Sequence, residues 1–401
     1  MVNGPRLAAA RRDRARSGGA RADSGRGGAG GSLDIAVFGL SVSSSWGNGH
    51  AALWRALVAA LLADGHRVAF FERDVEYYAR NRDLDALPPG GELVLYPSWE
   101  EALPRARRAI ARADAAVVTS YCPDALAAAA LLADEGRADL LRVFYDLDTP
   151  VTLARLAAGE PVGYVGPEGL GAYDLVLSYT GGGALDALRD RLGARRVAPL
   201  YGSVDPDAYR PARPEPRFEA ALSYLGTYAA DRQATVEALF VEPARARPGE
   251  RFVIGGAQYP PDFPWTPNTY FVRHLPPPEH PAFYASCRLT LNATRAAMAA
   301  SGWCPSGRLF EAAACGAPIL TDAWEGLDAF FEPGREILVA RSTADAFAAL
   351  DRDDGTLREV ARRARERTLD EHTATRRARE MVAAFEWAAS GATAPAMAVG
   401  A

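Results

Sequence analysis

Short apolar runs alternate with amphipathic stretches of helical length from Leu33 onward. The apolar residues within each run are continuous, which is typical of strands that are buried on both faces of a parallel sheet. The stretches between the runs carry apolar residues at helical spacing. The first half is predicted to contain strands at residues 33–40, 67–73, 92–97, 114–120, 140–146 and 173–180, and helices at residues 50–66, at 100–112, after Cys122 and at 182–192.

The alternation stops at a proline-rich segment, residues 201–216, which has no periodicity and is predicted to be a linker. It then resumes, with strands predicted at residues 221–228, 251–256, 269–275, 288–294 and 317–322 and helices from Thr343 onward. We therefore predict an α/β fold of two doubly wound, Rossmann-like domains, residues 32–200 and 217–370, which face a central cleft. A final helix at residues 371–390 is long enough to pack back on the first domain.

The two ends of the chain differ in composition from the alternating part. Residues 1–31 combine Arg, Ala, Gly and Ser with almost no large apolar side chain, so a disordered tail is predicted there, and a second one at residues 391–401. The arginine-rich tail is interpreted as an inert, solvated leader, with a nucleic-acid or membrane contact as the alternative. It lacks the apolar core of a secretory signal, and no apolar run has the length of a membrane span.

The composition excludes several kinds of chemistry. The net charge of -5 at pH 7 gives no electrostatic reason for nucleic-acid binding. The four cysteines form no C-x-x-C pair, which argues against a zinc ribbon or a redox motif and predicts a cytoplasmic location. The chain contains no lysine, so it has neither a Schiff-base lysine nor a Walker-type phosphate loop. A phosphate site must use arginine, backbone N–H groups and helix N-termini.

Ligands of doubly wound sheets bind at the carboxyl ends of the strands, so the segments after the strands are the candidate site. The first is "GLSVSSSWGNGH", residues 39–50, whose small residues let the backbone approach a ligand. It lacks the G-x-G-x-x-G dinucleotide pattern. His50, at the predicted helix start, is interpreted as a base, as an acceptor contact together with Trp46, or only as a helix-start residue.

Two acidic residues, Asp146 and Asp148, stand at the carboxyl end of the strand at residues 140–146. Buried carboxylates are costly unless they are solvated, paired or used, and either residue is a candidate general base for an acceptor hydroxyl. One alternative is that Asp148 or Thr149 caps the helix that begins near Pro150. The other alternative is a metal site at the D-x-D pattern formed by Asp146 and Asp148. We predict no metal site there.

The second domain opens with a similar turn, "SYLGTYAADRQ", in which Gly226, Thr227 and Tyr228 precede Arg232. Arg232 is predicted to lie in the first turn of a helix, where the helix dipole is already positive. The alternative is a solvated surface arginine, since the chain is rich in arginine.

Arg308 has the same placement in "PSGRLFEAAACGAPIL", together with Ser306 and Leu309. Two arginines at helix N-termini that face one cleft predict an anion with several charges, such as a diphosphate. Glu311 shares a helix face with Arg308. It is interpreted as a local ion-pair partner or as an acceptor of hydrogen bonds from two ribose hydroxyls.

Taken together, these segments resemble nucleotide-sugar glycosyltransferases of the GT-B fold, and most of all the CgeB-like (spore-maturation-type) family. The resemblance covers about residues 33–388. It rests on "SGRLFEAAACGAPILTD", "GLDAFFEPGREILV", "SSWGNGH", "FYDLDTPVTLARL", "YLGTYAADRQ" and "EHTATRRARE".

The resemblance implies roles for individual residues. Glu311 would bind the ribose, Arg308 and Arg232 the diphosphate, and Gly226 and Thr227 would form the turn on the phosphate side. Many retaining members carry a second glutamate eight residues before the ribose-binding one. This chain has Trp303 at that position, so the stereochemical outcome is not predicted.

We therefore predict a metal-independent, cytoplasmic glycosyltransferase that uses a nucleoside-diphosphate sugar as donor and no further cofactor. The acceptor is unidentified, with a specialised metabolite or an envelope component as candidates. Alternatives are a nucleotide-sugar epimerase or hydrolase on the same fold, or a non-catalytic nucleotide-sugar-binding or spore-envelope protein. No nucleic-acid partner is predicted.

Overall fold

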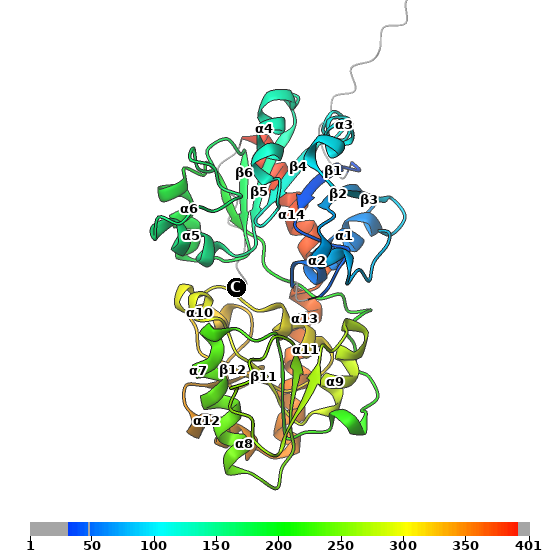
Figure 1. Cartoon of the computed structure of the whole chain (residues 1–401). Coiled ribbons are helices and arrows are strands. Elements are labelled where there is room, and N and C mark those ends of the chain that lie inside the picture. Colours follow the sequence, from blue (N-terminus) through cyan, green and yellow to red (C-terminus); the bar gives the residue numbers. More distant parts are fainter. Residues whose placement is uncertain (1–30, 47–48, 392–401) are drawn as a thin grey trace, which may run out of the picture. The chain divides into compact units, whose positions relative to one another are not determined.

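Two parallel β-sheets organise the chain (Figure 1), and the computed structural model describes residues 31–46 and 49–391. The predictions for residues 1–30 and 392–401 lie outside the described residues. The first sheet has the strand order β3-β2-β1-β4-β5-β6-β7, and every neighbouring pair is parallel. Its strands are β1 (Asp34–Gly39), β2 (Arg67–Arg73), β3 (Gly91–Tyr96), β4 (Ala115–Thr119), β5 (Leu141–Asp146), β6 (Leu175–Ser178) and β7 (Val197–Pro199).

The second sheet repeats this arrangement with the order β10-β9-β8-β11-β12-β13, again with parallel neighbours. In both sheets the order reverses beside the strand that opens the domain, as in a doubly wound fold. The predicted α/β fold with two Rossmann-like domains is confirmed. The strands are β8 (Leu222–Leu225), β9 (Phe252–Gly256), β10 (Thr269–Arg273), β11 (Thr290–Asn292), β12 (Ile319–Asp322) and β13 (Leu338–Ala340).

Helices connect the strands of each sheet. Those of the first half are α1 (Gly49–Ala63), α2 (Glu76–Ala79), α3 (Trp99–Ile110), α4 (Ala125–Glu135), α5 (Thr149–Ala157) and α6 (Gly183–Leu192). Those of the second half are α7 (Gln233–Val236), the π-helical turn η3 (Glu237–Val241), α8 (Glu242–Ala246), α9 (His280–Ser286), α10 (Ala296–Ser301), α11 (Gly307–Ala314), α12 (Thr343–Leu350), α13 (Asp354–Glu371) and α14 (Ala374–Ser390). Short 3₁₀ turns add η1 (Pro216–Phe218), η2 (Ala230–Arg232), η4 (Pro277–Glu279) and η5 (Leu327–Ala329).

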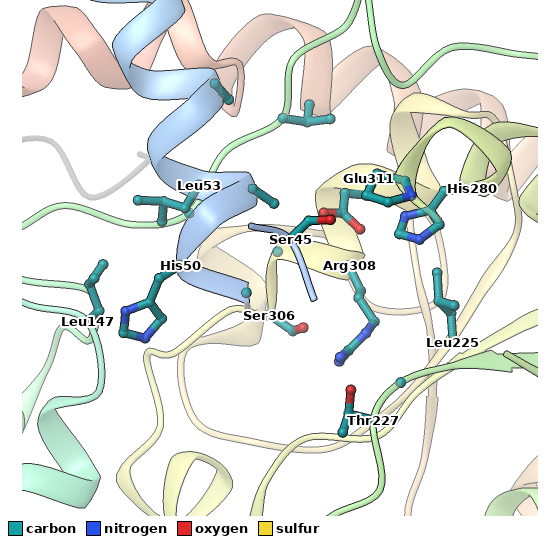
Figure 2. A pocket seen from close by; sticks show the side chains of 18 of the residues that line it. Ser45, His50, Leu53, Leu147, Leu225, Thr227, His280, Ser306, Arg308 and Glu311 are labelled. Atoms are coloured by element: carbon teal, nitrogen blue, oxygen red, sulfur yellow. The ribbon is translucent and has the colours of Figure 1, made fainter. Parts of the chain in front are cut away.

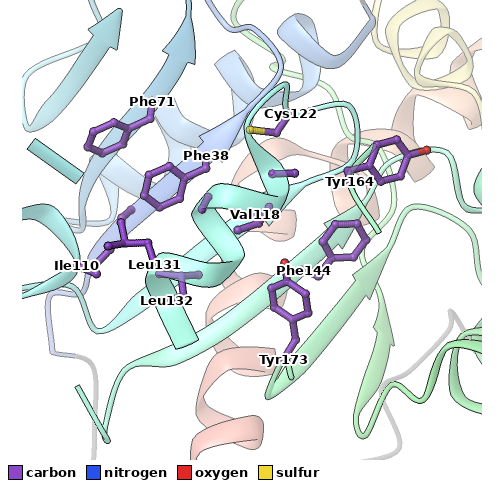
Figure 3. Packing of buried hydrophobic residues seen from close by; sticks show 14 of the residues in the cluster. Phe38, Phe71, Ile110, Val118, Cys122, Leu131, Leu132, Phe144, Tyr164 and Tyr173 are labelled. Carbon is purple, nitrogen blue, oxygen red and sulfur yellow. The ribbon is translucent and has the colours of Figure 1, made fainter. Parts of the chain in front are cut away.

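Each face of the first sheet buries its own apolar cluster, because alternate residues of a strand point to opposite faces. Phe38, Phe71 and Phe144 belong to one cluster with residues of α3 and α4 (Figure 3). Val37, Phe70 and Tyr145 belong to the other, with residues of α1 and α14. A strand that packs on both faces reads as a continuous apolar run, which is why these strands were predictable.

The C-terminal helix α14 belongs to the first sheet's core although it follows the second domain in sequence. Ala378, Met381 and Phe385 of α14 are buried in the same cluster as residues of α1. The final helix predicted at residues 371–390 corresponds to α14, and the chain breaks between α13 and α14 just before it. Thr373 is extended there, and its side chain accepts a hydrogen bond from the Arg376 amide at 3.3 Å as the cap of α14.

The chain passes between the two halves twice, and the two passages pair. Val204 donates its N–H to the carbonyl of His372 at 3.0 Å, and Ala374 donates to the carbonyl of Val204 at 2.8 Å. These bonds make a parallel bridge between Val204 and Thr373. The two connecting segments are therefore held side by side.

Candidate functional site

A cavity of about 700 Å³ lies where the carboxyl ends of both sheets meet. Residues that follow β1, β4, β5 and β6 line it from the first half, and residues that follow β8, β9, β10 and β11 line it from the second. Figure 2 shows His50 and Leu147 on one side of this cavity and Arg308, Thr227 and Glu311 on the other. The described strands thus converge where ligands of doubly wound sheets bind.

The N-terminus of α11 opens on the cavity through Ser306, Gly307 and Arg308. The Ser306 side chain makes no capping hydrogen bond, so it leaves the first N–H groups of the helix available. Within the described part of the chain, the Arg308 guanidinium makes no hydrogen bond or ion pair. A free cation beside free backbone N–H groups is an arrangement that binds phosphate.

The turn after β8 supplies the neighbouring wall. The backbone of Gly226 lies so close to Gly256 that a Cβ on Gly256, which has φ +158°, would be 2.0 Å from the Gly226 oxygen. Arg232 Nη1 donates to Tyr224 Oη and to the Thr227 carbonyl, both at 3.3 Å. Its side chain is therefore directed to this turn, and both Thr227 and Arg232 line the cavity.

The predicted helix around Arg232 differs from the observed one. Arg232 ends the 3₁₀ turn η2, and the α-helix that follows it, α7, has only 4 residues before η3 begins. The helical backbone continues without a break from α7 through η3 and α8 to Ala246, so Arg232 directly precedes the N-terminus of this longer helical segment.

Glu311 lies one turn deeper than Arg308 and also lines the cavity. Burial raises the pKa of the Glu311 carboxyl, while the Arg308 charge and a hydrogen bond with Tyr209 lower it in part. No ion pair joins Arg308 to Glu311 among the described residues, so the local ion-pair interpretation has no support in the geometry. The carboxylate instead faces the cavity.

On the opposite side, His50 and Asp148 form a pair. His50 Nε2 lies 4.0 Å from Asp148 Oδ2, and the two side chains keep 18% and 21% of their surface exposed. Burial lowers the pKa of His50, and the Asp148 charge opposes that shift. The Asp148 side chain makes no capping bond to α5. It lines the cavity, where its carboxylate interacts with His50 and Tyr121.

The position of Asp146 does not agree with its predicted role as a candidate general base. It is fully buried and does not line the cavity, so it does not reach an acceptor in this arrangement. Its Oδ1 receives the Asp148 N–H and the Thr152 hydroxyl, each at 3.1 Å. Its Oδ2 has no hydrogen-bond partner of normal geometry. Asp146 thus positions the backbone of Asp148 through this hydrogen bond from the buried side.

The buried state of Asp146 predicts a pH-dependent loss of stability. Burial raises its pKa from 3.8 to about 6, so the folded state binds its proton more tightly than the unfolded state does. Its contribution to the free energy of unfolding is lost as the pH rises from about 4 to about 6, and the loss amounts to at most about 3 kcal/mol. The free energy of unfolding of Asp146→Asn should therefore lack the decrease between pH 4 and pH 7 that this group causes in the wild type. Urea unfolding at several pH values measures this quantity. Equal pH slopes in the variant and the wild type would contradict this assignment.

Two predicted nucleotide contacts lie outside the cavity wall. Tyr228 packs on Tyr259, with ring centroids 5.7 Å apart, and Leu309 is buried in the core of the second domain. Neither lines the cavity, because side chains of adjacent positions on the turn and the helix point into the protein. Trp46, a predicted acceptor contact, packs against His274, with ring centroids 3.8 Å apart and ring planes inclined by 50°, and likewise does not line the cavity.

The sequence prediction missed Glu72 at the end of β2. Glu72 is fully buried, and its carboxylate receives the amides of Val42 and Ser43 at 2.7 and 2.9 Å and the hydroxyls of Ser41 and Ser43. The loop after β1 is therefore held by an acid that Rossmann folds otherwise use for ribose. The sequence does carry a signal for this role, because Glu72 is an acidic residue at the end of the second predicted strand.

Tyr121 was also missed. It lines the cavity beside His50, with ring centroids 5.5 Å apart, and it is held at φ 62°. A tyrosine in the left-handed region is strained, which marks a place where the fold fixes a side chain. A single sequence carries no signal for such a backbone angle.

Trp303 stands at the position where the resemblance to retaining enzymes would place a second glutamate, and its role here is steric. Its backbone N–H donates to the Glu325 carbonyl at 2.7 Å, and its backbone carbonyl accepts from the Gly181 amide at 2.9 Å. The indole covers Gly182 and Gly326, where an added Cβ would lie 2.4 Å from ring atoms. Trp303 therefore joins a loop of the second domain to the loop after β6.

Gly326→Ala should destabilise the protein well beyond the cost of its backbone conformation. Gly326 has φ +81° and meets the Trp303 ring, whereas Gly334 has φ +79° and no atom within 4 Å of an added Cβ. Gly334→Ala is thus the matched control, which carries the backbone strain of about 1 kcal/mol alone. We expect Gly326→Ala to lose at least 1–2 kcal/mol more of unfolding free energy, measured by urea denaturation, because overpacking adds roughly that amount. Equal losses would contradict a tight Trp303 contact.

No described helix is long and apolar enough to cross a membrane. No three His, Cys, Asp or Glu side chains of the described part gather as a group that could hold a metal ion.

Comparison with solved structures assigns the fold. Sucrose-phosphate synthase from Thermosynechococcus elongatus matches with a TM-score of 0.67 at 14% identity, over 89% of this chain and 99% of that chain. Anabaena HepE, solved in complex with UDP and glucose, matches with a TM-score of 0.61 at 13% identity, over 88% and 99% of the two chains. AviGT4, a glycosyltransferase involved in avilamycin A biosynthesis, matches with a TM-score of 0.57 at 17% identity, over 90% and 99%. The chain has the GT-B fold of glycosyltransferases.

The sequence of its second half adds a family match. Residues 232–383 fit the family described as "Glycosyl transferase-like", and this range contains Arg232, Arg308 and Glu311. No curated protein matches the chain. The chain is thus similar to GT-B glycosyltransferases in fold and in this part of its sequence. The narrower CgeB-like resemblance stays a prediction.

Proposed function

We propose that the protein is a glycosyltransferase that moves a sugar from a nucleoside-diphosphate donor to an acceptor hydroxyl. The observation that carries the proposal is the α11 N-terminus. There the Arg308 guanidinium makes no hydrogen bond or ion pair with any described residue, lies beside uncapped N–H groups and faces a cavity shared by two Rossmann-like domains. The diphosphate would lie against Arg308, Arg232 and the turn at Thr227. Glu311 would accept the two ribose hydroxyls.

The transfer needs a group to take the acceptor's proton and a site for the leaving diphosphate. We propose that His50 takes the proton from the acceptor hydroxyl and that Asp148 stabilises the imidazolium. The acceptor oxygen then bonds to the anomeric carbon, and the bond from that carbon to the diphosphate oxygen breaks with its electron pair on the diphosphate. Arg308, Arg232 and the α11 N–H groups stabilise the charge, so the proposed reaction uses no metal ion.

The acceptor half of the cavity favours a neutral acceptor with an apolar body. Much of its lining is apolar or aromatic, including Leu40, Leu53, Leu147, Tyr78 and Tyr121. Its arginine, Arg55, is already engaged by the Val42 carbonyl at 2.8 Å and by Asp83. An anionic acceptor would find no free cation there and would meet the Asp148 charge. A hydroxylated specialised metabolite suits this lining better than an anionic envelope polymer.

The test is product analysis. The protein is incubated with a panel of nucleotide sugars and with neutral hydroxylated aromatic acceptors, and mass spectrometry detects the glycosylated acceptor. Isomerised donor without acceptor product would indicate an epimerase, and free sugar alone a hydrolase. No turnover of any donor would overturn an enzymatic function. We propose a cytoplasmic site of action, which the four free, buried cysteines support.

A further inference from the structure

The segment that joins the two domains contributes a side chain to the cavity. Tyr209 lies between β7 and β8 and lines the cavity together with Glu311 and His280. Figure 2 shows Glu311 and His280 on the same side of the cavity. Tyr209 Oη is 3.2 Å from His280 Nδ1, and the same hydroxyl lies near enough to the Glu311 carboxyl to lower its pKa.

The other hydrogen bond of His280 determines which atom donates to which. His280 Nε2 is 3.2 Å from the Leu275 carbonyl, and a carbonyl only accepts, so the proton of the neutral ring is on Nε2. Burial lowers the pKa of His280 to about 4, so the ring is neutral at physiological pH. Nδ1 is then an acceptor and competes with Glu311 for the one hydroxyl proton of Tyr209.

We propose that Tyr209 is a positioning residue for the ribose-binding acid, and that its single proton is shared between Glu311 and His280. The inference rests on the proposed function, because it takes Glu311 as the ribose acceptor. When the Tyr209 hydroxyl points to Glu311 it stabilises and orients the carboxylate. When it points to His280, the carboxylate loses that donor.

Other titratable groups near Glu311 also interact with its carboxyl group. Apart from Tyr209, the groups that act electrostatically with Glu311 are Arg308, Tyr179, Tyr284 and Cys315, and His280 faces it through Tyr209. Arg308 is the only cation among them and favours the charged form. Tyr284 is a matched comparison, since its buried hydroxyl on α9 has no hydrogen-bond partner in the described chain.

The test measures nucleotide affinity against pH. Titration calorimetry of the full chain with UDP and with 2′,3′-dideoxy-UDP, between pH 4.5 and 8, separates the ribose contacts from the rest. ADP and its dideoxy analogue form a second pair. Burial raises the pKa of Glu311, so wild-type affinity for UDP should fall on the acid side as the carboxyl takes up a proton. The terminal phosphate of both nucleotides also takes up a proton in this pH range, so the decline due to Glu311 is the difference between the UDP and dideoxy-UDP profiles.

Tyr209→Phe removes a donor to the carboxylate, so the pKa of Glu311 rises and the acid decline moves to higher pH. Binding of UDP should weaken roughly 2- to 10-fold, as expected for the loss of one hydrogen bond. Binding of dideoxy-UDP should be unchanged, and Tyr284→Phe should behave as wild type. A linker tyrosine with only a structural role would weaken both nucleotides equally, and that result would overturn the inference.

His280→Ala tests the same competition with the opposite sign. Without Nδ1 as a competitor, the Tyr209 proton stays with Glu311, the pKa of Glu311 falls, and the acid decline moves to lower pH. This variant also keeps the test open if Tyr209→Phe fails to fold. A shift in the same direction as Tyr209→Phe, or no shift, would overturn the shared proton. Wild type that binds none of the four nucleotides would overturn the donor site itself, which is a distinguishable outcome.

Discussion

Arg308→Ala should sharply reduce the rise in melting temperature that a nucleoside diphosphate produces in the wild type. The wild type at a ligand concentration 100 times the Kd gains about 2.7 kcal/mol of stability. Loss of charge-assisted hydrogen bonds to phosphate costs about 1.5–3 kcal/mol, which weakens binding roughly 10- to 100-fold. Because the Arg308 guanidinium makes no hydrogen bond or ion pair within the described chain, its removal should leave the melting temperature of the free protein nearly unchanged.

The control for this prediction is Arg245→Ala. Arg245 lies on α8, pairs with Glu242 and does not line the cavity, so the nucleotide effect should remain. Thermal shift with a panel of nucleoside diphosphates is the measurement. The donor site is misassigned if Arg308→Ala binds as tightly as the wild type.

Asp148→Asn should lower kcat by about 10²- to 10⁴-fold, the range expected when general-base catalysis is lost. The amide nearly matches the carboxylate in shape but does not stabilise a charged His50. Donor affinity should be unchanged, since Asp148 faces the acceptor half. Initial rates of product formation and separate nucleotide titrations give the two quantities. Asp186→Asn, an exposed acid of α6 that pairs with Arg189, is the control.

The pairing of Asp148 with His50 adds a sharper form of this prediction. If the two residues act as one unit, the double variant with His50→Ala should be no slower than the slower single variant. Multiplicative losses would show that they act independently and would contradict the proposed proton transfer.

The fold was predictable because both sheets are parallel and covered by helices, so their strands appear as continuous apolar runs. The exceptions have a physical reason. Strands β7 and β13 have only 3 residues each and lie at sheet edges, where little apolar sequence is needed.

The candidate site was predictable only in part. Arg308, Arg232, Glu311, Asp148 and His50 all line the cavity, because the loop after a strand or the start of a helix carries each of them. The direction of a side chain within its element was not predictable. Asp146 and Asp148 are two residues apart, yet only Asp148 reaches the cavity. Tyr209 and Tyr121 were missed because their placement depends on the linker path and on an unusual backbone angle.

The two connecting segments that pair at Val204 and Thr373 determine which parts of the sequence belong to each half. The first half consists of the segment up to β7 together with α14, so it is discontinuous in sequence. The second half, residues 205–372, is an insertion whose two ends lie next to each other at the bridge between Val204 and Thr373. Chain ends that lie close together are the condition under which one domain is inserted into another. A shortened chain that stops before α14 would therefore damage the first half, while the second half would keep all of its own sequence.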